Sequence, residues 1–84
     1  MNILVTGGSG FIGSALVKYL VQETEHNVMN LDKNTYAGDE ISNFSINNCP
    51  NYTFKKIDIC DKNAVSKAIN SFKPDRIIHL AAES

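Results

Sequence analysis

The stretch Thr6-Gly7-Gly8-Ser9-Gly10-Phe11-Ile12-Gly13 decides the fold of this chain. It follows a short apolar run, Ile3-Leu4-Val5, and leads into an amphipathic run that begins at Phe11. A strand that ends in a glycine turn and opens into a helix directs backbone N–H groups and the positive end of the helix dipole at one point. The stretch therefore predicts a phosphate-binding turn, although a glycine turn that is only a structural connection has the same composition.

The three glycines of the turn have the spacing Gly-x-x-Gly-x-x-Gly, which differs from the Gly-x-Gly-x-x-Gly of many dehydrogenases. Gly7 is predicted to allow the tight bend after the strand. Gly10 would let the backbone approach a diphosphate, and Gly13 would let the helix pack closely on the sheet.

Composition bounds the class of protein. A length of 84 residues allows one compact unit, and 43% hydrophobic with 20% charged residues is ordinary for a globular chain. The net charge of −1 gives no basis for a nucleic-acid partner. Neither a membrane span nor a signal peptide is indicated, so a cytoplasmic location is expected. Cys49 and Cys60 do not form a CxxC pair and are expected to be reduced thiols, and no metal site is predicted.

Periodicity predicts strands that alternate with helices. The expected strands are residues 3–5, 28–31, 52–59 and 76–82, and the expected helices run from Phe11 to about Thr24 and from an N-cap at Asp61 to Pro74. Residues 33–48 are predicted to be mainly loop. The fold class is therefore α/β, an incomplete Rossmann-like doubly wound parallel sheet with strand order 3-2-1-4 and helices on both faces. Its last strand would have an unpaired outer edge, so the chain is expected to be the beginning of a longer protein.

Each predicted helix has an expected buried face. The apolar residues of the first helix are Phe11, Ile12, Ala15, Leu16, Tyr19 and Leu20, with Lys18, Gln22 and Glu23 opposite. Those of the second helix are Ala64, Val65, Ala68, Ile69 and Phe72.

Asp32 strengthens the interpretation of the glycine turn. It lies at the end of the second predicted strand, where a carboxylate accepts hydrogen bonds from both hydroxyls of an adenosine ribose. Because a carboxylate there repels a 2′-phosphate, NAD is favoured over NADP, and the neighbouring Lys33 partly offsets this preference. The alternative is an aspartate that only begins a loop.

Later strand ends supply weaker candidates. Asp58 and Ile59 are expected at the same edge of the sheet, where they would contact adenine, although Asp58 is equally compatible with a solvated turn. The small residues after Leu80, namely Ala81 and Ala82, would let a cofactor approach the backbone. His26 and His79 are expected to be structural.

These motifs resemble a known family. Thr6-Gly7-x-x-Gly10-x-x-Gly13 resembles the start of the extended short-chain dehydrogenase/reductases that act on nucleotide sugars. Three further segments resemble the dTDP-glucose 4,6-dehydratases within that family, and the resemblance spans the whole chain. The segments are Asp32-Lys33-Asn34-Thr35-Tyr36-Ala37-Gly38, Asp58-Ile59-Cys60-Asp61 and His79-Leu80-Ala81-Ala82-Glu83-Ser84.

The resemblance implies a bound NAD, a dTDP-glucose substrate and a homodimer in the full-length protein. The residues implied in NAD binding are Gly7, Gly10, Phe11, Ile12, Gly13, Asp32, Lys33, Asn34, Thr35, Gly38, Asp58, Ile59, Leu80, Ala81, Ala82 and Glu83, and Ser84 would reach the substrate. Asn34 stands where the family usually has a larger apolar residue.

The resemblance also implies a reaction. NAD would take hydride from C4 of the glucose unit, water would leave across C5 and C6, and the hydride would return to C6. This chemistry needs a Tyr-x-x-x-Lys pair and an Asp-Glu pair. None of them is present, so no catalytic residue is predicted and the 84 residues alone are expected to be inactive. A related epimerase or decarboxylase, and a non-catalytic NAD-binding module, stay open as alternatives.

Overall fold

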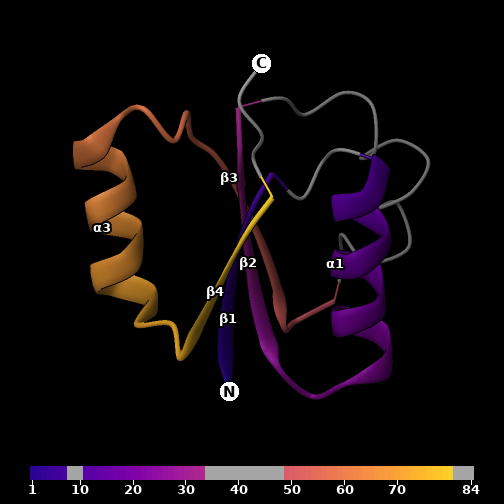
Figure 1. Ribbon diagram of the computed structural model, residues 1–84. Helices are drawn as coiled ribbons and strands as arrows, with labels where there is room; N and C mark the ends of the chain where they lie inside the picture. Colours follow the sequence, from indigo (N-terminus) through magenta and orange to yellow (C-terminus); the bar gives the residue numbers. More distant parts are fainter. Residues whose placement is uncertain (8–10, 34–48, 81–84) are drawn as a thin grey trace.

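The computed structural model describes residues 1–7, 11–33 and 49–80, and of Phe11 only the backbone. In these ranges, four parallel strands form one sheet in the order β3-β2-β1-β4. Helices α1 and α3 cover opposite faces of the sheet (Figure 1). The predicted strand order and the helices on both faces are therefore confirmed. The strands are β1 (Asn2–Thr6), β2 (Asn27–Asp32), β3 (Tyr52–Lys56) and β4 (Arg76–His79), and the helices are α1 (Phe11–Glu23) and α3 (Lys62–Phe72).

The central strand β1 divides the core into two apolar clusters. Ile3 and Val5 pack with Val17 on the α1 side, whereas Leu4 packs with Ala68 on the α3 side. Both Val5, at 0% exposure, and Leu4, at 1%, are buried. A strand covered on both faces needs a continuous apolar run, which is why Ile3-Leu4-Val5 lacks polar alternation.

Helix α1 buries only part of the face that was predicted, since Leu20 is buried and Leu16 packs against the core. The residues that face the sheet are Gly13, Ser14, Val17, Leu20 and Val21. Ile12 is 73% exposed, Tyr19 is 57% exposed and Ala15 is also exposed, so the prediction for these three residues was wrong. The helix is apolar on nearly every side, so its pattern does not select one face. The small residues Gly13 and Ser14 face the sheet because they allow the first turn of the helix to approach it closely.

Helix α3 has the predicted N-cap and the predicted apolar face. The carboxylate of Asp61 accepts a hydrogen bond from the Ala64 N–H at 3.2 Å, and Ala68 is buried against the sheet. The helix ends at Phe72 because Lys73 adopts the left-handed region at φ 53°, where its N–H donates to the carbonyl of Ile69 at 2.8 Å. The residue before a proline is disfavoured in the helical region, so Pro74 ends the helix through Lys73.

Two strands end earlier than predicted. β3 stops at Lys56 and not at Ile59, although the Ile57 N–H still donates to the Asp32 carbonyl at 3.0 Å. The next residues form a turn, in which the Asp61 N–H donates to the Asp58 carbonyl at 2.8 Å. This turn ends the strand because it directs the chain away from β2. β4 ends at His79.

Three hydrogen bonds join the segment just before β4 to the first residue of β1. The Asn2 N–H donates to the Asp75 carboxylate at 2.7 Å, and the Asp75 N–H donates to the Asn2 carbonyl at 2.6 Å. The Asn2 side-chain amide also donates to the Phe72 carbonyl, at 2.9 Å. These bonds fix the point at which the chain enters β4, and so they fix the register of β4 against β1.

None of the described helices is long and apolar enough to cross a membrane. Cys49 and Cys60 are not joined in a disulfide.

Candidate functional site

The carboxyl ends of β1, β2 and β4 are tied together by backbone hydrogen bonds. The Gly7 N–H donates to the Leu31 carbonyl at 2.9 Å, and the Leu80 N–H donates to the Thr6 carbonyl at 2.8 Å. This edge lies opposite the N-terminus (Figure 1). Ligands of open parallel α/β sheets bind outside the carboxyl ends of the strands, so the edge is the candidate site.

Gly7 makes the bend at the end of β1. Its φ of 80° lies in the left-handed region, which glycine enters without the steric penalty of a Cβ. Because its N–H is already bonded to Leu31, Gly7 shapes the turn and does not offer that donor to an anion. Donors for a phosphate would have to come from later in the turn.

Helix α1 begins at Phe11 and its first turn lies against the sheet. Gly13 is buried, as is Ser14 at 2% exposure. A Cβ at position 13 would occupy the space between the helix and the sheet, so the glycine brings the helix N-terminus close to the exit of β1. This proximity suits a negatively charged group. Ile12 projects into solvent.

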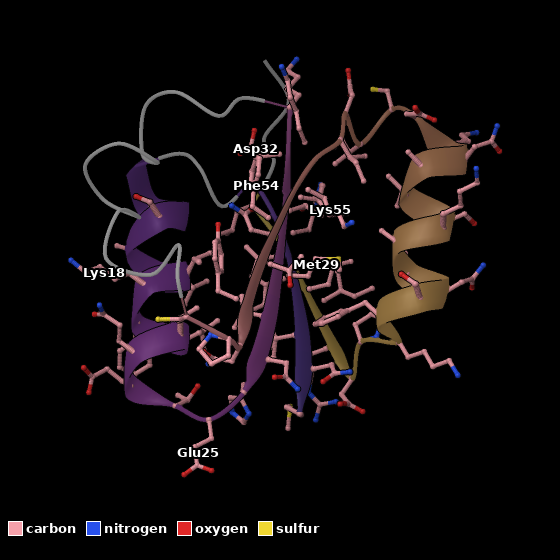
Figure 2. All side chains as sticks on the ribbon, turned by 180° about the vertical axis from the view of Figure 1, so that it is seen from behind. Lys18, Glu25, Met29, Asp32, Phe54 and Lys55 are labelled. Carbon is pink, nitrogen blue, oxygen red and sulfur yellow. The ribbon has the colours of Figure 1, made fainter. Side chains whose placement is uncertain are left out.

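Asp32 is the last residue of β2 and is half-buried. Figure 2 shows it near the end of the sheet that is opposite Glu25, with Phe54 beside it, whereas Met29 and Lys55 lie toward α3. Asp32 is paired in register with Lys56, and the exposed Lys33 follows it. Asp32 therefore lies at the candidate site, and its binding of ribose hydroxyls stays a prediction.

Asp58 is exposed and stabilises its own turn. Its Oδ1 accepts a hydrogen bond from the Cys60 N–H at 2.9 Å, and this bond is the main cause of a pKa below the ordinary value. Desolvation raises the pKa, whereas a hydrogen bond from the Cys60 thiol and the charge of Lys33 lower it. The exits of β2 and β3 are neighbours, because the two strands are paired up to Asp32 and Lys56. The contact of Asp58 and Ile59 with adenine stays a prediction.

Several predicted site residues lie outside the described residues, and their roles also stay predictions. They are Gly10, Asn34, Thr35, Gly38, Ala81, Ala82, Glu83 and Ser84, together with the side chain of Phe11. Among the described residues, no group of three or more His, Cys, Asp or Glu side chains is placed to hold a metal ion.

Two polar pairs were not predicted from the sequence. The Thr6 hydroxyl and the His79 Nδ1 lie 2.6 Å apart, and the fully buried Asn30 donates from its side-chain amide to the Tyr52 hydroxyl at 3.4 Å. Both pairs join neighbouring strands. The predicted strand order places their strands side by side, but only the register brings the side chains together.

The strand order β3-β2-β1-β4, the bend at Gly7, helix α1 on one face and α3 on the other define the Rossmann class of parallel α/β folds. The chain belongs to the GDP-mannose 4,6 dehydratase family, whose model matches residues 4–84.

Within this family, the chain is similar to several individual proteins. The chain is 51% identical to dTDP-glucose 4,6-dehydratase of Haemophilus influenzae over 84 residues, which is all of this chain and 25% of the relative. It matches the crystal structure of dTDP-glucose 4,6-dehydratase from Bacillus anthracis in complex with NAD with a TM-score of 0.89 at 40% identity, over 99% of this chain and 27% of that one. A UDP-Glc/GlcNAc 4-epimerase of Campylobacter jejuni is more distant, at 28% identity and a TM-score of 0.82, over 98% of this chain and 24% of that one. The chain thus spans about a quarter of the length of these relatives.

Proposed function

We propose that these 84 residues form the first part of the NAD-binding domain of a dTDP-glucose 4,6-dehydratase. The observation that carries the proposal is the position of Asp32, at the end of β2, beside the strand exit where Gly7 turns the chain. Similarity to the dehydratases of H. influenzae and B. anthracis supports the choice of reaction. The substrate domain and the catalytic segments would lie outside this chain, and the 84 residues alone would not turn over substrate.

In this proposal each part of the edge has a separate task. Gly7 turns the chain and the N-terminus of α1 faces the diphosphate, while Asp32 accepts from the adenosine ribose. The Asp32 carboxylate would exclude a 2′-phosphate, against the weaker opposing effect of Lys33. Bound NAD supplies a hydride acceptor that is regenerated in each turnover.

Other predicted contacts complete the proposed cofactor site. Ile12 and Gly13 belong to the diphosphate turn, and Ile59 would pack on adenine. Leu80 already lies next to the glycine turn through its hydrogen bond to Thr6. Those outside the described residues are Gly10, the side chain of Phe11, Asn34, Thr35, Gly38, Ala81, Ala82 and Glu83 for NAD, and Ser84 for the nucleotide sugar. A homodimer and a cytoplasmic location complete the proposal.

The test is calorimetric titration of the full-length protein, freed of cofactor, with NAD and with NADP. Asp32→Ala should weaken NAD binding about 10-fold or more, because a hydrogen bond to a charged group contributes about 1.5–3 kcal/mol. Asp32→Ala should also reduce the difference between the affinities for NAD and for NADP. Glu25→Ala is the matched control, since that exposed carboxylate lies at the other end of the sheet (Figure 2). Equal affinity of the unaltered protein for both cofactors would defeat the proposal.

A second candidate is a nucleotide-sugar 4-epimerase, because the C. jejuni epimerase has the same fold over 98% of this chain. Incubation of the full-length protein with dTDP-glucose separates the two reactions. A 4-keto-6-deoxy product supports the dehydratase, whereas a C4 epimer that keeps its 6-hydroxyl supports the epimerase.

A further inference from the structure

We infer that His79 is a positioning residue of the dinucleotide site and that it acts through Thr6. The inference rests on the proposed NAD-binding function. Its starting point is the hydrogen bond between the Thr6 hydroxyl and the His79 Nδ1, which are 2.6 Å apart and partly buried. Thr6 and His79 are the last residues of β1 and β4, and they are paired in register. The bond therefore lies at the edge where the cofactor is proposed to bind.

Alternation along the strands places the bond on the α3 side of the sheet. Val5 and Ile78 pack on the α1 side, so their neighbours Thr6 and His79 face the other way. Thr6 is buried, at 6% exposure, whereas His79 is exposed. A change that removes the bond but keeps the shape of the Thr6 side chain should therefore leave the packing of the core intact and act locally.

Two backbone hydrogen bonds hold the end of β1 in the plane of the sheet. The Gly7 N–H is bonded to β2, and the Thr6 carbonyl accepts from the Leu80 N–H just beyond β4. The bond to His79 adds a restraint that acts out of this plane. Threonine is branched at Cβ and has restricted χ1 rotation, so fixing its hydroxyl also fixes the backbone that carries it.

The hydrogen bond between Thr6 and His79 restrains the backbone immediately before Gly7. Gly7 is in the left-handed region and has more conformational freedom than any other residue type. An anchor at Thr6 sets the direction in which the glycine turn leaves the sheet. The same bond holds the end of β4 against the end of β1, so the exits of the two strands are kept at a constant separation.

A double-mutant cycle in the full-length protein tests the inference. Thr6→Val removes the hydroxyl while keeping the shape, and His79→Phe keeps a ring without the nitrogen. Each change should raise the Kd for NAD about fivefold, the value of one ordinary hydrogen bond. The double variant should be no weaker than either single one, because all three lack the same bond.

Conservative variants separate positioning from a general structural effect. Thr6→Ser keeps the hydroxyl, and His79→Asn places a polar atom where Nδ1 is, so both should stay within about twofold of the unaltered Kd. In the ligand-free protein, hydrogen exchange of the peptide that contains Gly7 should be faster in Thr6→Val and unchanged in Thr6→Ser. If His79→Phe does not fold, His79→Ala takes its place, since His79 is exposed.

The outcomes distinguish this inference from the function on which it rests. Absence of NAD binding by the unaltered protein would overturn both. If NAD binds and Asp32→Ala weakens it, but Thr6→Val and His79→Phe leave the Kd and the exchange rate unchanged, only the role of His79 is overturned. Strictly additive losses in the double variant would overturn it as well.

Discussion

Replacing Gly7 with alanine tests the conformation on which the site is built. At a φ of 80°, an alanine Cβ crowds the following carbonyl, which costs about 1–2 kcal/mol. The more restricted unfolded chain offsets about 0.4–1 kcal/mol of this cost. If the backbone instead relaxes, the 2.9 Å bond from the Gly7 N–H to the Leu31 carbonyl is lost, which costs about 0.5–1.5 kcal/mol. By either route the free energy of unfolding should fall by about 1 kcal/mol.

Equilibrium unfolding of the ligand-free, full-length protein in urea measures this loss, and three variants identify its cause. Asparagine enters the left-handed region more readily than alanine, and a β-branched residue enters it least readily. Stability should therefore decrease in the order glycine, asparagine, alanine, valine. Crowding of the side chain would give another order, in which asparagine is worse than alanine because it is larger. That order, or an unchanged midpoint for Gly7→Ala, would refute the argument from φ.

Two further predictions concern α3 and the turn before it. Lys73→Gly should raise the free energy of unfolding by about 0.5 kcal/mol, because glycine adopts the left-handed conformation of Lys73 without a steric penalty. Lys67→Gly, within the helix, should lower the free energy of unfolding by about 1 kcal/mol. Urea unfolding measures both changes, and a midpoint that falls in both variants contradicts the prediction. The pKa of the Asp58 carboxyl, followed by NMR titration, should lie below 3.8 because the Cys60 N–H donates to the carboxylate. Because the pKa is lowered in the folded state, the hydrogen bond to Asp58 contributes to stability above pH 3.8, and the contribution is lost as the pH falls through the folded-state pKa. A titration midpoint of Asp58 at or above 3.8 would contradict the role of this hydrogen bond.

Local patterns were sufficient for the outline of the fold. The apolar run at Ile3-Leu4-Val5 predicted a strand buried on both faces, and the spacing of strands and helices predicted a parallel sheet. Asp61 was recognised as an N-cap from its neighbours in the chain alone, and the structure has that hydrogen bond. The apolar run and the N-cap each involve residues within a few positions of one another, so the local sequence determines them. The alternation of strands and helices then restricts the topology to a parallel sheet.

The sequence by itself therefore determined the class of fold, the strand order and the place of Asp32 at the end of β2. Only the tertiary structure decided which face of α1 is buried, because a helix that is apolar on most sides takes the face that best fits the sheet, here the one with Gly13 and Ser14. It also decided that β3 ends at Lys56, where a turn held by Asp58 directs the chain away from β2. The pair of Thr6 and His79 joins residues 73 positions apart, so it exists only because the register of two parallel strands places their last side chains together.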